Sequence, residues 1–130
     1  MKYTLEERVA KARDLRAQGY NCSQCVVMAF DDVMDVDVNM LVRAAGGFGT
    51  GIGASGDICG ALTGTTMVLG LVREGVARPA LYREVREAIS AFEELEGARD
   101  CRDLKGAGRK PCLDLILDAV TLLHNRLADA

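Results

Sequence analysis

The chain has 130 residues, of which 49% are hydrophobic, and this length fits a single domain over residues 1–130 that buries its own core without disulfide bonds. Sixteen basic and nineteen acidic residues are mixed along the sequence and give a net charge of −3, which argues against nucleic acid as a partner. The N-terminus is charged from its second residue and lacks the apolar core of a secretory signal, so we expect a cytoplasmic protein.

The first two predicted helices share one type of start signal. Thr4 and Glu7 have the spacing of a capping box, and Asn21 and Gln24 repeat it with an amide in place of the hydroxyl. A shorter third helix is predicted before the glycine-rich stretch that follows. The three predicted helices cover 5–19, 22–34 and 35–45.

The stretch GGFGTGIGASG, residues 46–56, resembles a phosphate-binding loop only superficially. No strand precedes it, and no glycine is followed by lysine and a hydroxyl residue, so we expect neither a dinucleotide nor a Walker-type site. Asp57 is predicted to cap the fourth helix, over 58–75. Its apolar run ends at Arg73 and is shorter than the roughly 20 residues that cross a bilayer, so the chain is predicted not to span a membrane.

Glycines recur every four residues at the start of this fourth helix. Gly56, Gly60 and Gly64 therefore lie on one helix face, where they allow another backbone to approach closely. This pattern predicts a buried, central helix.

Two prolines mark the starts of the last long helices. Pro79 begins a helix over 79–97, and Pro111 begins another over 111–128, with a short helical turn and a loop between them. His124, the single histidine, is predicted on the surface of the last helix. Since no segment alternates with a two-residue period, the fold is predicted to be an all-α compact bundle of five to six helices.

The five cysteines carry most of the functional information. An odd number in a reducing compartment favours metal or redox chemistry over structural disulfides. Only Cys22 and Cys25 form a short pair, whereas Cys59, Cys101 and Cys112 stand far apart, so the sequence does not encode a zinc ribbon. Any site must be assembled from several helices.

Four of these thiols fall in the first turn of a predicted helix. They are Cys22, Cys59, Cys101 and Cys112, while Cys25 lies one turn further in. Free N–H groups and the positive end of the helix dipole favour a thiolate there, so the sequence predicts lowered pKa values for the four thiols.

The segments YNCSQCVV, FGTGIGASGDICGALTG, CRDL and CLDLILDAV resemble the C_GCAxxG_C_C family of redox-active proteins over almost the whole chain. The resemblance implies that Cys22, Cys59, Cys101 and Cys112 are the four family cysteines. A related domain accompanies haem and an iron–sulfur cluster in split-Soret cytochromes. No Cys-x-x-Cys-His is present, so covalent c-type haem is not expected. Cys25 is an additional thiol, and Thr50 interrupts the glycine run.

Three hypotheses remain open at this point. In the first, the four family cysteines bind an iron–sulfur cluster or another soft metal, with Gly56, Gly60 and Gly64 forming a backbone shell around it. In the second, no metal is bound and all five cysteines are redox thiols: Cys59 attacks, and Cys22 or Cys25 resolves the mixed disulfide. In the third, the chain is a helical interaction module with inert cysteines. The sequence assigns no enzymatic reaction. We expect an unidentified redox partner protein, and a homodimer is left open.

Overall fold

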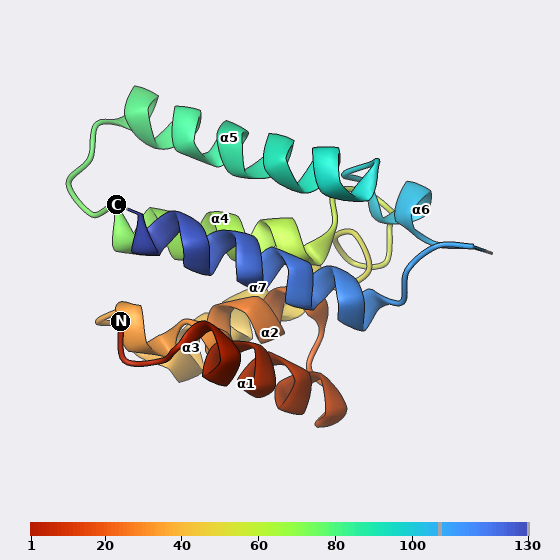
Figure 1. The fold of residues 1–130 in the computed structure, drawn as a ribbon, viewed down its shortest axis with the longest axis horizontal. Coiled ribbons are helices and arrows are strands. Elements are labelled where there is room, and N and C mark those ends of the chain that lie inside the picture. Colours follow the sequence, from red (N-terminus) through yellow and green to blue (C-terminus); the bar gives the residue numbers. More distant parts are fainter. Residues whose placement is uncertain (107, 130) are drawn as a thin grey trace.

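The computed structural model describes residues 1–106 and 108–129, which form seven α-helices and two short 3-10 turns, with no strand among them (Figure 1). The expected all-α class is confirmed. The helices are α1 Leu5–Ala17, α2 Cys22–Ala29, α3 Val38–Ala44, α4 Gly60–Val72, α5 Arg78–Glu96, α6 Cys101–Leu104 and α7 Cys112–Ala128. The 3-10 turns are η1 Asp31–Val33 and η2 Ala45–Phe48.

The helices α4 and α7 occupy the middle of the bundle. In Figure 1, α5 lies on one side of them and α1, α2 and α3 lie on the other, with both chain ends at the same end of the molecule. The helix α4 packs against α2, α5 and α7 and buries most of its apolar side chains between them. The prediction of a buried central helix after the glycine-rich stretch is therefore confirmed. None of the helices in the described part of the chain has the length and apolar character needed to cross a membrane.

Both predicted capping boxes are present. The Thr4 hydroxyl accepts from the Glu7 N–H and the Asn21 amide oxygen accepts from the Gln24 N–H, and each partner side chain accepts from the cap backbone in return. The helix α2 ends earlier than predicted, because the chain turns into η1 after Phe30.

The predicted start of α4 is wrong. Asp57 does not cap the helix. The N-cap residue is Cys59, and the first residue of α4 is Gly60. The cause is a contact distant in sequence: Ile58 and Asp100 form an isolated antiparallel bridge, and the Cys101 N–H donates to the Asp57 carbonyl at 2.6 Å. This pairing keeps the chain extended up to Cys59.

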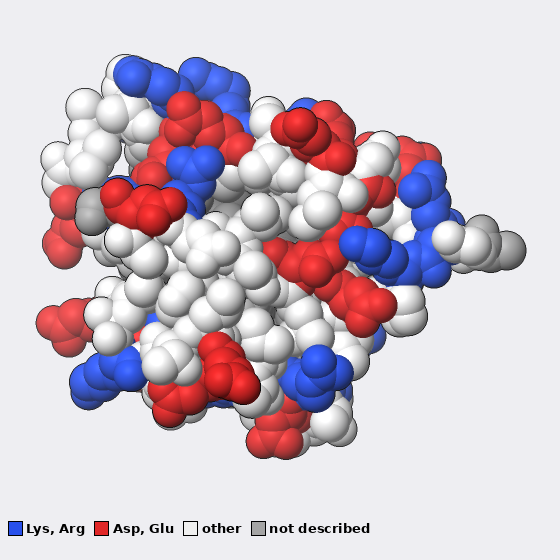
Figure 2. Space-filling model, viewed as in Figure 1, with Lys and Arg blue, Asp and Glu red and all other residues white. Residues whose placement is uncertain are grey.

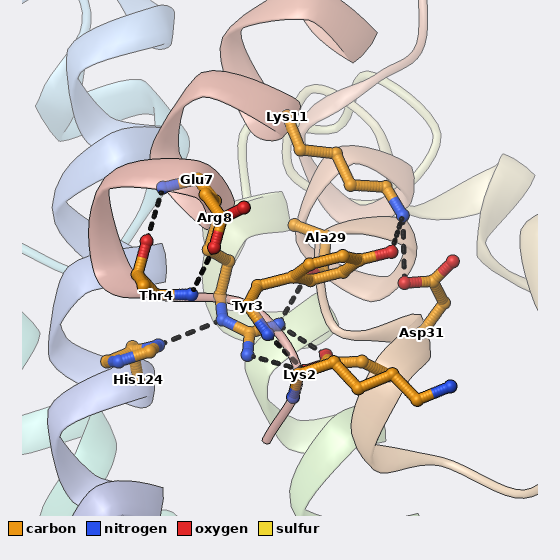
Figure 3. Close-up of polar contacts among 10 residues, drawn as sticks. Lys2, Tyr3, Thr4, Glu7, Arg8, Lys11, Ala29, Asp31 and His124 are labelled. Carbon is orange, nitrogen blue, oxygen red and sulfur yellow. Dashed lines mark hydrogen bonds and ion pairs between the residues drawn. The ribbon is translucent and has the colours of Figure 1, made fainter.

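A buried ion pair lies away from the cysteines, between α1, η1 and α7. The Arg8 guanidinium is fully buried and donates to both carboxylate oxygens of Asp32, at 2.6 and 2.9 Å. It also donates to the Ala29 carbonyl at 2.6 Å and, through Nε, to Nδ1 of His124 at 2.9 Å (Figure 3). The predicted surface position of His124 is therefore wrong, since its side chain is buried as an acceptor. We refer to Arg8, Asp32 and His124 as the Arg8 network.

The network predicts a loss of stability in mild acid. Burial and the nearby Arg8 cation lower the pKa of His124 below its ordinary 6.5. The unfolded chain therefore binds this proton more readily, and the histidine's contribution to stability is lost as the pH falls below about 6.5. Glu96 acts in the opposite sense, because burial and Asp118 raise its pKa to about 7 and its contribution is lost as the pH rises from about 4.5 through 7.

A matched variant separates these two effects. His124→Asn keeps an acceptor for Arg8 but cannot be protonated, whereas Glu96 is common to both proteins. In urea unfolding at fixed pH values, we expect the wild type to lose stability relative to His124→Asn between pH 7 and pH 5. A difference that does not change with pH would contradict this assignment.

Candidate functional site

The N-terminal ends of four helices meet around one small cavity. Cys22, Cys101 and Cys112 are the first residues of α2, α6 and α7, and Cys59 is the N-cap of α4. All four line a cavity of about 60 Å³, which we call the cysteine cavity. The other lining residues are Arg16, Asn21, Thr50, Gly60, Leu104, Lys105 and Leu115. The fold thus brings together thiols that stand up to ninety positions apart (112 − 22) in the sequence.

The fifth cysteine is placed differently. Cys25 is fully buried, does not line the cysteine cavity, and its thiol donates to the Tyr20 carbonyl at 3.5 Å. It lies one helical turn beyond Cys22, and this hydrogen bond holds its side chain against the segment that joins α1 to α2. The structure therefore separates four cysteines that share a cavity from one that does not.

Burial is the largest influence on the pKa values of Cys22, Cys25 and Cys59. It raises the pKa of Cys59 to about 12 and that of Cys25 to about 11, and it also raises the pKa of Cys22, with Cys112 and Cys101 adding to the rise. The predicted lowering of the pKa is therefore wrong for Cys22 and Cys59. Their backbone positions at helix N-termini were predicted correctly, but desolvation of the thiolate outweighs the helix dipole.

Two cations that sequence reasoning missed line the same cavity. Arg16 and Lys105 are both lining residues, and Arg16 donates to the Tyr20 carbonyl at 3.0 Å. Its charge opposes the rise in the pKa of Cys22 and of Cys25. The sequence indicated the role of Arg16 only weakly, because the helix dipole alone makes basic residues common in the last turn of a helix.

The three glycines proposed as a backbone shell have separate places. Gly60 lines the cavity, and a Cβ there would lie 3.0 Å from the Cβ of Cys22. Gly64 is not a lining residue; a Cβ there would lie 2.8 Å from the Ser23 carbonyl oxygen, so this glycine permits close packing of α4 on α2. Gly56 also lies outside the lining, where its φ of 75° favours glycine.

The glycine-rich stretch contains an unusual backbone conformation. Residues 50–54, which we call the left-handed turn, have φ values between 53° and 73° in succession. Three of them carry side chains, namely Thr50, Ile52 and Ala54, and each such residue costs about 1–2 kcal/mol in this conformation. Backbone hydrogen bonds hold the turn, including Gly53 N–H to the Gly47 carbonyl at 2.8 Å.

The arrangement of the four thiols favours one kind of metal centre over another. Among the described residues, no three His, Cys, Asp or Glu side chains are close enough together to hold a metal ion as they stand. Four thiols spread around one cavity fit a cluster better than a single ion, because a cluster distributes its thiolates over two or four irons. A cavity of about 60 Å³ holds only a few waters, so residues that line it must move to accommodate a cluster.

Comparisons with known proteins identify a family for this chain. A family model described as "Putative redox-active protein (C_GCAxxG_C_C)" matches residues 20–126, a range that includes all five cysteines. A protein of Archaeoglobus fulgidus, described as "Uncharacterized protein", is 27% identical over 146 aligned positions that cover 95% of this chain and 97% of that protein. No solved structure matches the chain at a significant level.

Proposed function

This chain belongs to the C_GCAxxG_C_C family of redox-active proteins, and from that membership and the cysteine cavity we propose a cluster-binding function. In this proposal Cys22, Cys59, Cys101 and Cys112 bind an iron–sulfur cluster or another soft metal, and the protein transfers electrons or senses redox state. When bound, an iron–sulfur cluster would supply one-electron chemistry that protein side chains do not provide.

One observation carries the proposal. Four cysteines lie at the N-terminal ends of four different helices around a single cavity, while Cys25, one turn beyond Cys22, does not line it and donates to the Tyr20 carbonyl. Inert packing would not distinguish the fifth thiol from the other four. The backbone N–H groups at these helix N-termini, together with Arg16 and Lys105, favour a negatively charged centre held by thiolates.

The raised pKa values support a metal over a free nucleophile. A thiol whose pKa is about 12, as for Cys59, is almost wholly protonated at pH 7 and is a poor nucleophile. A soft cation bound in the cavity would offset the desolvation that keeps the proton on. In this proposal the metal-free protein is a state that precedes metal binding, with buried and protonated thiols, and it is not itself active in thiol–disulfide exchange.

Cysteine variants test this function. Protein purified without oxygen is expected to contain stoichiometric iron and sulfide and to absorb visible light. Each of C22S, C59S, C101S and C112S should lose most of that absorption, because each removes one ligand. C25S is the matched control and should retain it. Colourless wild-type protein without stoichiometric iron or zinc would sink the proposal, as would a loss in C25S equal to that in the other four variants.

Thiol–disulfide exchange is a second candidate, supported by the proximity of Cys101 and Cys112 that raises the pKa of Cys22. Mild oxidation of the reduced, metal-free protein followed by peptide mapping separates it from the first. A disulfide between two cavity cysteines would favour this alternative, whereas five free thiols would exclude it. Failure of both tests would leave the helical interaction module.

The setting of this function is also part of the proposal. We infer a cytoplasmic protein that exchanges electrons with an unidentified redox partner protein, with a homodimer as an option and no role for nucleic acid. In support, Figure 2 shows Lys and Arg interspersed with Asp and Glu around an uncharged middle on the face drawn. That face offers no uniform basic surface for a phosphate backbone.

A further inference from the structure

One part of the wall of the cysteine cavity differs from the rest. Ten of its eleven lining residues belong to a helix or cap one; Asn21 and Cys59 are N-caps and Lys105 is a C-cap. Thr50 belongs to neither class and lies in the left-handed turn. It is also exposed, so it stands at the mouth of the cavity. It is therefore the one lining residue whose backbone can move without moving a helix or a helix cap.

The two ends of this turn are tied to residues next to the cysteines. On the far side, Arg102, which follows Cys101, donates to the Ser55 and Gly56 carbonyls at 3.1 and 3.0 Å. On the near side, Gly49 lies so close to Asn21, the residue before Cys22, that a Cβ would be 3.0 Å from the Asn21 Cβ. The turn is thus anchored at both ends and strained between them.

We propose that the left-handed turn of residues 50–54 is the gate of the cysteine cavity. In this structure it is closed, and Cys59 behind it is only 4% exposed. Opening relieves the left-handed conformation of Thr50, Ile52 and Ala54 and widens the cavity, while α2, α4, α6 and α7 keep their places. The gate rests on the proposed function only in treating the four cysteines as the site.

Thiol labelling of the reduced, metal-free protein measures this opening. Timed reaction with N-ethylmaleimide and tandem mass spectrometry give separate rates for Cys59, behind the gate, and Cys25, which no gate motion exposes. Cys59 is expected to react much faster than Cys25, because Cys25 requires the end of α1 to separate from α2. Equal rates would mean that both thiols react through general unfolding, and would overturn the gate.

Two substitutions at the tip change the strain without removing a contact. Gly53 has a φ of 58° and nothing within 4 Å of an added Cβ, so Gly53→Ala adds only backbone strain to the closed turn. It should speed labelling of Cys59 by about 5- to 30-fold. Ala54→Gly relieves strain at the neighbouring position and should slow labelling about threefold, the gain being reduced by the extra freedom of glycine in the open turn.

The matched control is the same substitution outside the turn. Gly70 lies in α4, also with nothing within 4 Å of an added Cβ. Gly70→Ala stabilises α4 without touching the turn, so it should leave the Cys59 rate unchanged. The gate is wrong if both turn variants leave the Cys59 rate unchanged, or if Gly70→Ala changes that rate by a comparable factor. Labelling needs no metal, so failure here and failure to bind a cluster are separate results.

Discussion

Arg8→Met is expected to lower the free energy of unfolding by about 3–5 kcal/mol, because it leaves the Asp32 carboxylate buried without its cation. The Asp32 side chain is only 1% exposed. Burial opposes its ionisation, yet hydrogen bonds from Arg8 and from the Tyr3 and Lys2 backbone lower its pKa to about 2. The variant removes the strongest of these donors and also leaves Nδ1 of His124 without its donor.

Urea denaturation at pH 7 measures the effect, with Arg13→Met as the matched control. Arg13 lies on the same helix but is exposed, and its replacement should change stability by no more than about 0.5 kcal/mol. The double variant R8M/D32N should recover part of the loss, since removing both charges avoids an unpaired buried ion. Equal losses in R8M and R13M would show that the network is not a stability determinant.

Gly64→Ala is expected to cost about 3 kcal/mol, although a single methyl group is added. A Cβ at this position would lie 2.8 Å from the Ser23 carbonyl oxygen and 2.9 Å from the Val26 Cβ, and both atoms belong to the buried face of α2. Neither atom is the flexible end of a side chain, so the two helices must move apart.

The control for this prediction lies on the same helix. Gly70→Ala adds the same methyl group where it meets nothing, and it should raise stability by about 0.5–1 kcal/mol through helix propensity. Thermal unfolding of the two variants gives opposite shifts if α2 and α4 pack as described. A shift of the same sign and size in both would contradict the close contact at Gly64.

The sequence predicted what depends on short-range signals. The capping boxes at Thr4 and Asn21 fix the starts of α1 and α2, and the start of α2 fixes the placement of Cys22. The start of α4 could not be predicted, because it depends on pairing with residues more than forty positions away (100 − 58). Local capping rules carry no information about such a partner.

The thiol pKa values of the site also could not be predicted from local sequence. Sequence position showed that the cysteines lie at helix N-termini, which lowers a thiol pKa, but it did not show how deeply Cys22 and Cys59 are buried, which raises it. The contact between Arg8 and His124 spans 116 positions and was equally invisible. The thiol pKa values are set by desolvation, and the position of His124 is set by a contact, both of which arise only in the tertiary fold.

The family match begins at residue 20, yet α1, which precedes it, contributes to both the Arg8 network and the cysteine cavity. Arg8, near the start of this helix, neutralises the buried carboxylate of Asp32, and Arg16, in its last turn, lines the cysteine cavity. A chain trimmed to the matched segment would retain every cysteine and lose both counter-ions. The smallest unit that keeps the electrostatic setting of the thiols is therefore longer than the segment defined by its cysteine signature.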